Sequence, residues 1–375
     1  AHPAELVKII DVSFPEPGTL IFGNTNIEVS DGSGSGEIRI DADASDLVGL
    51  AQPESCEEVV GVVGRYYDLF QLMPRIKEDL PCAEKYKQTG EDLAISNDLT
   101  LDIVTWNIEW FGDEGNSPAG ANADAIQKDS VKAVLSALDA DIYAVEEVSD
   151  DALFAQMVSE MNGYNYVLSD YTSYPNDPGV KQKVGFVYKT STVSVVKTMP
   201  LLASLHSYYG GDGSPLVNYP GGDVTRFYAS GRLPFMMVAD VTINGITKQY
   251  NIIDIHARAN SGTDAELRYE MRKYDIGVLK DTLDAYYADA NLILVGDYND
   301  DVDVTVADIT STTVTSYETF VTDPDNYSVV TGELSEEGFR SYVFETDMID
   351  HIMLSNELFD EYIDGSARVH YEFYD

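Results

Sequence analysis

The stretch ILVGDYND, residues 293–300, decides the fold of this chain. It opens with the apolar run Ile293 to Val295, which is typical of a strand covered on both faces, and it ends in Asp297, Asn299 and Asp300. Polar residues at the carboxyl edge of a strand are where α/β proteins place their chemistry. No basic residue lies among these acceptors, so the stretch predicts a strand edge that faces a cation.

Helix-like and strand-like segments alternate on both sides of this stretch. Apolar residues recur at helical spacing within residues 131–138, 153–161 and 267–279, so each of these segments predicts a helix. Between them lie apolar runs typical of strands: LDIVTW, DIYAVEEV, VGFVY, FMMVADVTI, YNIIDI, NLILVG and IDHIML. Long strands that can pair in antiparallel fashion, mixed with few helices, predict an α/β (α+β) four-layer sandwich of two mixed β-sheets flanked by helices.

The N-terminal region has a different pattern. TLIFGNTNIEVSDGSGSGEIRI indicates a strand, a turn rich in glycine and a second strand, and EEVVGVVGRYYDLFQLMPRI indicates two more short strands. We therefore expect a small all-β barrel over residues 1–90. A polar linker over 91–100 follows, and a larger catalytic domain extends over 101–375.

The composition is that of a globular and strongly acidic protein, with 44% hydrophobic residues, a net charge of −42 and a pI near 4.1. At the ionic strength of seawater the Debye length is about 4 Å, which screens such repulsion. The acidity therefore either adapts the protein to salty surroundings or serves solubility alone. No apolar run approaches the roughly 18 residues of a membrane span, so we expect no such span, and we expect a monomer.

The two cysteines, Cys56 and Cys82, both lie in the N-terminal region. Because they belong to one small module and no other cysteine occurs, we predict that they form a disulfide. The alternative is two unrelated buried thiols. A disulfide implies export, so we expect a secreted or periplasmic protein. The start of the chain, AHPAELVKII, lacks the plan of a signal peptide, as a cleaved signal or a trimmed chain would.

Four predicted strands end in oxygen-bearing side chains. They supply Asn107 and Glu109, Glu146 and Glu147, Asp297 and Asn299, and Asp350 with His351. A single carboxylate at a strand end is more often a solvated turn residue, so the inference rests on the joint pattern. Oxygen donors from several strand ends are what Mg²⁺, Mn²⁺ or Ca²⁺ require.

The ordered series TWNIEWF, DIYAVEEV, IIDIHA, LVGDYND and MIDHIMLS resembles the endonuclease/exonuclease/phosphatase superfamily, the fold of pancreatic deoxyribonuclease. The N-terminal region resembles the OB-like modules that precede such nucleases in some exported bacterial proteins. The resemblance covers roughly residues 100 to 360, and it specifies the fold more closely than the substrate.

The resemblance implies roles for residues of the first, second and fourth motifs. Glu147 would be the main metal ligand, beside Glu109, and Asn107 would orient the metal or the scissile phosphate. Asp297 would activate the attacking water and contribute to the metal site, and Asn299 would hold a phosphate oxygen. The implied metal is Mg²⁺ or Mn²⁺, with Ca²⁺ as a structural ion.

The remaining motifs complete the implied site. His256 would contact the phosphate and stabilise developing charge, and Asp350 would join the catalytic and metal-binding carboxylates. His351 would support the site from the other face of its strand. The superfamily has Gln at position 146, where this chain has Glu146, and the added charge beside Glu147 raises a carboxylate pKa or tightens a cation.

Basic residues are few and gather in the middle of the predicted catalytic domain. We expect Lys183, Arg232 and Arg258, with Tyr188, to bind substrate, either as a positive stripe for a phosphate backbone or as ordinary partners of surface acids. In the small module, Tyr66, Tyr67 and Phe70 either stack bases or pack against the predicted catalytic domain.

The preferred function is therefore a metal-dependent exported endonuclease that degrades DNA, with RNA as a further substrate. The first alternative is a phosphoesterase for lipid head groups or small esters, which an exposed aromatic hairpin would favour; no such hairpin is evident from the sequence. The second is a nucleic-acid-binding member that has lost hydrolysis.

The superfamily closes with a Ser-Asp-His motif and a last core strand, and neither follows Asp350 before the end, ARVHYEFYD. We expect that the catalytic domain here lacks its last strand, either because the chain is shortened or because the motif is lost.

Overall fold

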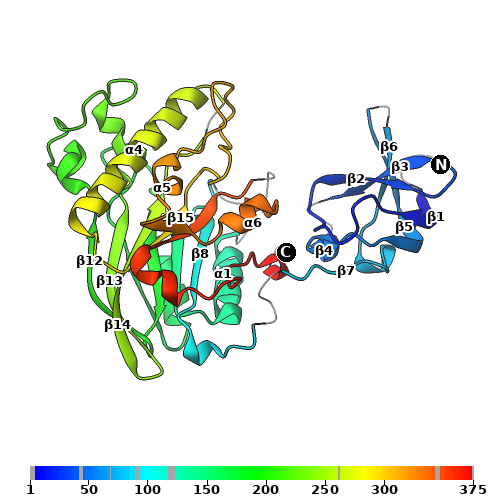
Figure 1. Ribbon diagram of the computed structural model, residues 1–375, viewed down its shortest axis with the longest axis horizontal. Helices are drawn as coiled ribbons and strands as arrows, with labels where there is room; N and C mark the ends of the chain where they lie inside the picture. The colour runs from blue at the N-terminus through cyan, green and yellow to red at the C-terminus, as the bar shows by residue number, and fades with distance from the viewer. Residues whose placement is uncertain are drawn as a thin grey trace. The chain divides into compact units, whose positions relative to one another are not determined.

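The computed structural model describes residues 5–41, 45–67, 69–88, 93–116, 123–260, 262–342 and 347–373. The chain forms two compact units, the small unit Ala1–Leu93 with Arg368–Asp375, and the large unit Ala94–Ala367 (Figure 1). The division expected from sequence placed the final segment with the large unit instead. It packs with the small unit because the Gln88 side chain exchanges hydrogen bonds of 2.6 and 2.9 Å with the backbone of Val369.

The small unit is a closed five-stranded barrel with the strand order β1-β2-β3-β6-β5. Its strands are β1 (Leu6–Ser13), β2 (Thr25–Ser30), β3 (Ser35–Ile40), β5 (Ser55–Tyr66) and β6 (Leu69–Met73), beside a two-stranded sheet of β4 (Leu50–Ala51) and β7 (Glu84–Lys85). Cys56 and Cys82 form a disulfide, as predicted, with an S–S distance of 2.01 Å. The disulfide joins β5 to the segment after β6, so it closes a loop around the barrel core.

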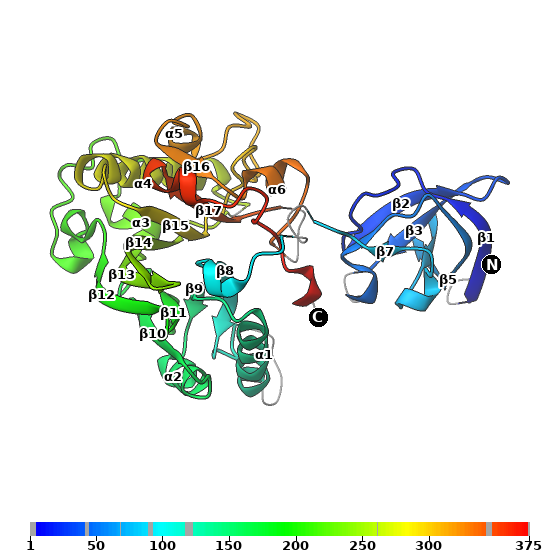
Figure 2. The ribbon, with the colours of Figure 1, turned by 60° about the horizontal axis from the view of Figure 1, so that its bottom comes forward.

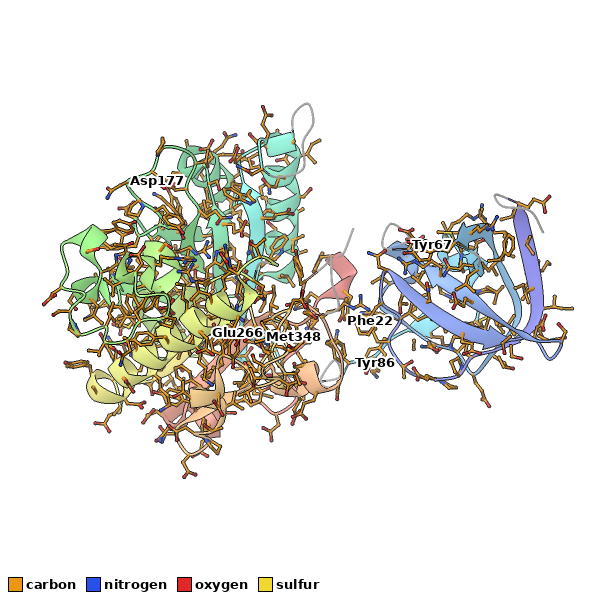
Figure 3. All side chains as sticks on the ribbon, turned by 90° about the horizontal axis from the view of Figure 1, so that it is seen from above. Phe22, Tyr67, Tyr86, Asp177, Glu266 and Met348 are labelled. Atoms are coloured by element: carbon orange, nitrogen blue, oxygen red, sulfur yellow. A yellow bond between two sulfur atoms is a disulfide. The ribbon has the colours of Figure 1, made fainter. Side chains whose placement is uncertain are left out.

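The β5–β6 hairpin carries exposed aromatic residues. Tyr66 is 63% exposed and Tyr67, labelled in Figure 3, is 81% exposed; Phe70 is 53% exposed. These side chains therefore do not pack in the barrel core. This exposed hairpin could not be recognised from the sequence, because the apolar pattern alone does not show where β5 ends and β6 begins.

The large unit contains two mixed sheets. The four-stranded sheet has the order β10 (Tyr164–Leu168), β11 (Lys183–Lys189), β9 (Ile142–Val148) and β8 (Ile103–Phe111). The six-stranded sheet has the order β12 (Val193–Pro200), β13 (Phe235–Ile243), β14 (Ile246–His256), β15 (Leu292–Asp297), β17 (Asp350–Ser355) and β16 (Tyr327–Val329).

The helices of the large unit include the three that the sequence predicted. The α-helices are α1 (Ala123–Leu138), α2 (Asp151–Ser159), α3 (Phe227–Gly231), α4 (Ala265–Tyr286), α5 (Glu318–Val321) and α6 (Gly332–Glu336). Across both units the 3₁₀ helices are η1 (Ser45–Leu47), η2 (Lys77–Asp79), η3 (Asn97–Leu99), η4 (Ala203–Leu205), η5 (Ser207–Tyr209), η6 (Val224–Arg226), η7 (Asn356–Glu361) and η8 (Tyr371–Phe373). Asp150 caps α2 by accepting hydrogen bonds from two backbone N–H groups of its first turn.

The two sheets pack face to face around a shared apolar core, to which Phe186 of the smaller sheet and Val295 of the larger contribute. The outer face of the four-stranded sheet is covered by α1 and α2, where Phe154 is buried, and the outer face of the six-stranded sheet by α4, where Leu279 is buried. Figure 2 shows these layers from the side. The order helix, sheet, sheet, helix is the expected four-layer arrangement.

Among the described residues, no helix combines the length and the apolar composition that crossing a membrane would need.

Candidate active site

The predicted strand ends meet at one edge of the sandwich. β14 and β15 run parallel and end in register at His256 and Asp297, while β17 runs antiparallel to β15 and begins at Asp350, opposite Asp297. β8 and β9 are also parallel, with Asn107 opposite Glu146. Within the large unit, a hydrogen bond from Asn107 to Asp297 joins the edges of the two sheets.

An irregularity at the ends of β8 and β9 positions the first two motifs. The register slips between Asn107 and Phe111, so that three residues of β8 oppose one residue of β9. Within the slip, Glu109 and Trp110 have φ of 43° and 47°, and Glu147 across from them has φ of 64°. Bulges of this kind re-aim side chains next to active sites.

Asn107 lies between the two central carboxylates. Its Nδ2 donates a hydrogen bond of 2.9 Å to Asp297 Oδ2 and one of 3.3 Å to Glu147 Oε1. Its Oδ1 accepts from the backbone N–H of Glu109 at 3.0 Å, and the N–H of Trp110 donates to Glu147 Oε2 at 3.0 Å. The side chains of Asn107 and Glu147 are therefore fixed by neighbours on both strands.

His256 is buried beside the same carboxylates. Its Nε2 lies 3.5 Å from Asp297 Oδ2 and 3.6 Å from Glu147 Oε1. Burial, and then the positive charge of Arg232, hold the pKa of His256 well below its ordinary value. The imidazole is therefore neutral near pH 7, and it can donate a hydrogen bond toward a phosphoryl oxygen.

The last two strand ends add desolvated carboxyl groups. Burial raises the pKa of Asp350 to about 8, and the charge of Asp297 adds to this rise. Burial also raises the pKa of Asp297 to about 6, although hydrogen bonds from the Asn107 amide and the Asn299 N–H act to lower it. Among the described residues, none forms a hydrogen bond with the buried Oδ1 of Asp350. These carboxylates would be stabilised by a cation in their midst.

Behind Glu147, a second carboxyl pair lies between the sheets. Glu146 and Asp254 are fully buried, and their carboxyl groups interact with each other; Thr105 Oγ1 donates to Glu146 at 3.2 Å and the Gly185 N–H to Asp254 at 2.9 Å. Burial raises the pKa of both groups well above their ordinary values, so we expect the pair to share a proton. A raised pKa at Glu146 or Glu147 was expected from the sequence, whereas the partner Asp254 was not.

Arg232 has another position than the sequence suggested. It is buried, and its guanidinium donates to the backbone carbonyls of His256 and Ala257 at 3.0 and 2.9 Å and to the Gln182 side chain at 2.9 Å. It therefore fixes the backbone at two successive carbonyl groups, those of His256 and Ala257. Asn299 also binds the Ala257 carbonyl, at 3.2 Å, with its own backbone N–H donating to Asp297 at 2.8 Å.

Three further predicted substrate residues are not brought to this cluster. Tyr188 lies in the core between the sheets, because it shares a strand face with Phe186. Lys183 pairs with Asp151 and Asp170 at 2.7 and 3.1 Å. Arg258 is buried and donates to the backbone carbonyl of Arg226, so the expected positive stripe is largely bound within the protein.

His351 lies in the core behind the cluster, as expected for a supporting residue. Its Nδ1 is 3.0 Å from Thr331 Oγ1 and its Nε2 is 3.1 Å from the Met348 carbonyl.

The donor set fits a hard divalent cation that keeps open positions. In the described part of the chain, no three His, Cys, Asp or Glu side chains form a ready-made metal cage. Mg²⁺ typically takes only one or two carboxylates from the protein and completes its shell with water and phosphate. Glu147 matches this role, with the exposed Glu109 beside it, whose pKa is raised by desolvation and by the Glu147 charge.

The large unit matches a known protein family. Residues 104–363 match the model of the Endonuclease/Exonuclease/phosphatase family, whereas no curated protein sequence matches the chain. The solved human Nocturnin catalytic domain with bound sulfate anion is 15% identical, covering 68% of this chain and 81% of that chain with a TM-score of 0.45. Humanized D. rerio TDP2 is 14% identical, and the match covers 68% of this chain and 81% of that chain with a TM-score of 0.40. The mannosyl-6-phosphatase of Bacteroides thetaiotaomicron is 13% identical, and the match covers 68% of this chain and 86% of that chain with a TM-score of 0.42.

Proposed function

Because this chain belongs to the endonuclease/exonuclease/phosphatase family, we propose that it is a divalent-metal-dependent phosphodiester hydrolase that is exported and cleaves DNA, with RNA as a further substrate. Phosphoester hydrolysis is common to the family. The observation that supports this chemistry in the present chain is the convergence of Glu147, Asp297, Asn107 and His256 from both sheets.

Each residue of this cluster has its own role in the proposed hydrolysis. Glu147, with Glu109 beside it, would hold Mg²⁺ or Mn²⁺, and the ion would supply positive charge opposite the phosphoryl oxygens and lower the pKa of a water molecule. Asp297, with a pKa of about 6, is ionised at neutral pH and accepts the proton of the attacking water. His256 donates a hydrogen bond to a phosphoryl oxygen, and Asn107 keeps Asp297 and Glu147 apart and oriented.

Export is supported by the disulfide, since such bonds persist in oxidising compartments. The five-stranded barrel supports the assignment of the small unit as OB-like.

A second candidate, a phosphatase or phosphodiesterase for small or lipid-borne esters, is favoured by two observations. Arg232 and Arg258 are buried, and Lys183 is paired with acids, which leaves little positive surface for a long phosphate backbone. The exposed hairpin with Tyr66 and Tyr67 is the feature expected of the lipid alternative, although it belongs to the small unit.

One set of assays tests the chemistry and separates the substrates. The purified full chain is assayed with Mg²⁺, with Mn²⁺ and with EDTA on supercoiled plasmid, bis-p-nitrophenyl phosphate, p-nitrophenyl phosphate and sphingomyelin vesicles. We expect metal-dependent nicking of the plasmid that EDTA abolishes. Hydrolysis of only the monoester or only the lipid would replace DNA as the substrate.

The matched variants are Glu147→Gln and Glu336→Gln, which make the same chemical change in the cluster and at an exposed position of α6. Glu147→Gln should abolish hydrolysis on every substrate and leave the circular dichroism spectrum unchanged, because it removes a charged ligand and keeps the shape. Glu336→Gln should retain full activity. Activity of Glu147→Gln close to that of the parent would contradict the assigned site.

A further inference from the structure

The barrel of the small unit is nearly open between β1 and β2. Only Ser13 and Ser30 pair there, whereas the other edge of β1 pairs with β5 from Leu6 to Ser13. Over the described residues, the β1 edge that faces β2 therefore has no strand partner between Leu6 and Val12. An unpaired strand edge presents a row of N–H and C=O groups to which another chain can add.

A cavity of about 460 Å³ lies beside this edge. Its apolar walls include Val7 and Ile9 of β1, Val29 of β2 and Leu72 of β6, and the half-exposed ring of Phe70 borders it. Val7 and Ile9 are two residues apart, so they point to the same face of β1. The cavity therefore matches apolar side chains that recur at every second residue of an added strand.

The charge of the cavity comes from carboxylates alone. Asp31 and Glu37 line it, and no lysine or arginine is among its lining residues in the described part of the unit. Asp31 Oδ1 accepts hydrogen bonds from the hydroxyl and the N–H of Ser33, which hold the pKa of Asp31 below its ordinary value. Glu37 Oε2 accepts from the buried Gln71 amide at 2.9 Å. Such a lining attracts cations and disfavours a phosphate backbone.

From the unpaired edge, the cavity and its charge we infer a binding site that is separate from the hydrolytic cluster. We propose that the cleft between β1 and the β2–β3 turn binds an extended, basic stretch of polypeptide by strand addition. The main chain of the ligand pairs with the free edge of β1, alternate apolar side chains enter the cavity, and Lys or Arg side chains meet Asp31 and Glu37.

This assignment differs from a base-stacking platform on the β5–β6 hairpin. Arg65 lies over the Phe70 ring, 5.7 Å from its centroid, yet it does not line the cavity. A single-stranded nucleic acid would need cations along the cleft to hold its phosphates. Binding of an oligonucleotide is therefore the outcome that separates the two assignments.

The test uses the full chain and fluorescein-labelled octapeptides in fluorescence anisotropy. The probes are an alternating Lys-Val peptide, the same composition arranged as a Lys block and a Val block, the alternating peptide N-methylated at every second amide, and a dT12 oligonucleotide. We expect saturable binding of the alternating peptide, at least tenfold weaker binding of the block and N-methylated peptides, and binding of dT12, where it occurs, that Phe70→Ala leaves unchanged.

The variants distinguish the cleft from the general acidity of a chain of net charge −42. Asp31→Asn/Glu37→Gln should weaken binding of the alternating peptide about tenfold. Glu54→Gln/Glu57→Gln, which removes the same charge from exposed positions of the same unit outside the cavity lining, should change it less than twofold.

Equal binding of the block peptide, or equal losses in the two double variants, would show non-specific attraction and overturn the proposal. Binding of dT12 that Phe70→Ala abolishes would assign the cleft to nucleic acid instead.

Discussion

The Glu146→Gln variant provides a sharp test of the electrostatics beneath the active site. In the parent, Glu146 and Asp254 are fully buried, and their raised pKa values predict that they share a proton. A glutamine would keep the shape, its amide N–H would replace that proton toward Asp254, and its oxygen would keep the bond from Thr105. We therefore expect the variant to fold. Its stability should not change with pH over the range in which the parent must take up a proton at this pair.

The sign of the effect follows from linkage. Because the pKa of Glu146 is raised in the folded state, the folded protein holds a proton that the unfolded chain releases above pH 4.5. The stability of the parent therefore falls as the pH rises from about 4.5 toward the raised pKa, by up to about 1.4 kcal/mol per pH unit. Between pH 5 and pH 7 the variant should gain up to about 2.7 kcal/mol relative to the parent.

The assay is thermal unfolding of parent and variant at half-unit steps from pH 4.5 to pH 8 without metal. A gain of that size corresponds to roughly 5–11 °C in Tm, with little difference at pH 5. Glu336→Gln, on the surface, should follow the parent at every pH. Curves for Glu146→Gln and parent that stay parallel over the whole range, or a variant destabilised at pH 7, would refute the shared proton.

The remaining predictions concern backbone geometry, a buried ion pair, the disulfide and salt. Gly296→Ala should destabilise the large unit by more than about 4 kcal/mol, because Gly296 has φ of +135° and a Cβ would lie 1.9 Å from a carbonyl oxygen of β14; a variant that melts like the parent contradicts this. In urea denaturation, Asp300→Asn should cost about 3–5 kcal/mol, since it leaves the fully buried Arg272 without the carboxylate 3.0 Å away; a loss below 1 kcal/mol would exclude a strong pair. Reduction of Cys56–Cys82 should destabilise the small unit by about 3 kcal/mol, and two free thiols in protein purified under oxidising conditions would disprove the disulfide. Stability should also rise from low salt toward seawater ionic strength as charge repulsion is screened, whereas a steady fall would contradict that explanation.

The interior strands and helices could be predicted from the sequence because the spacing of their apolar residues shows which faces are buried. The runs that became β9, β13, β14 and β15 and the helices α1, α2 and α4 were all expected. The strands β10, β12 and β16 were not expected, and each lies at the edge of its sheet. Edge strands carry more polar and exposed residues, as the burial of β12 shows, so their pattern is weaker.

The candidate site shows a similar division. Asp297 and His256 could be predicted to lie together because they end neighbouring parallel strands of one sheet. Glu147 ends a strand of the other sheet, and its place beside them was implied by the family resemblance. The pairing of Glu146 with Asp254 could not be predicted, since it depends on how one sheet lies over the other. The burial of Tyr188 could have been predicted, because it alternates with Val184 and Phe186 along β11 and shares their face.

Several residues around the site have positive φ, and the hydrogen bonds of their N–H groups explain why. Glu109, Trp110 and Asn299 have φ of 43°, 47° and 52°, which L-residues avoid at roughly 1–2 kcal/mol each. In each case the N–H of that residue donates to a side chain of the cluster: Glu109 to Asn107, Trp110 to Glu147 and Asn299 to Asp297. The strained conformations thus aim backbone donors at the groups that must be held in place. Strain of this kind persists where surrounding structure enforces it, and here it orients the carboxylates that would bind the cation and the attacking water.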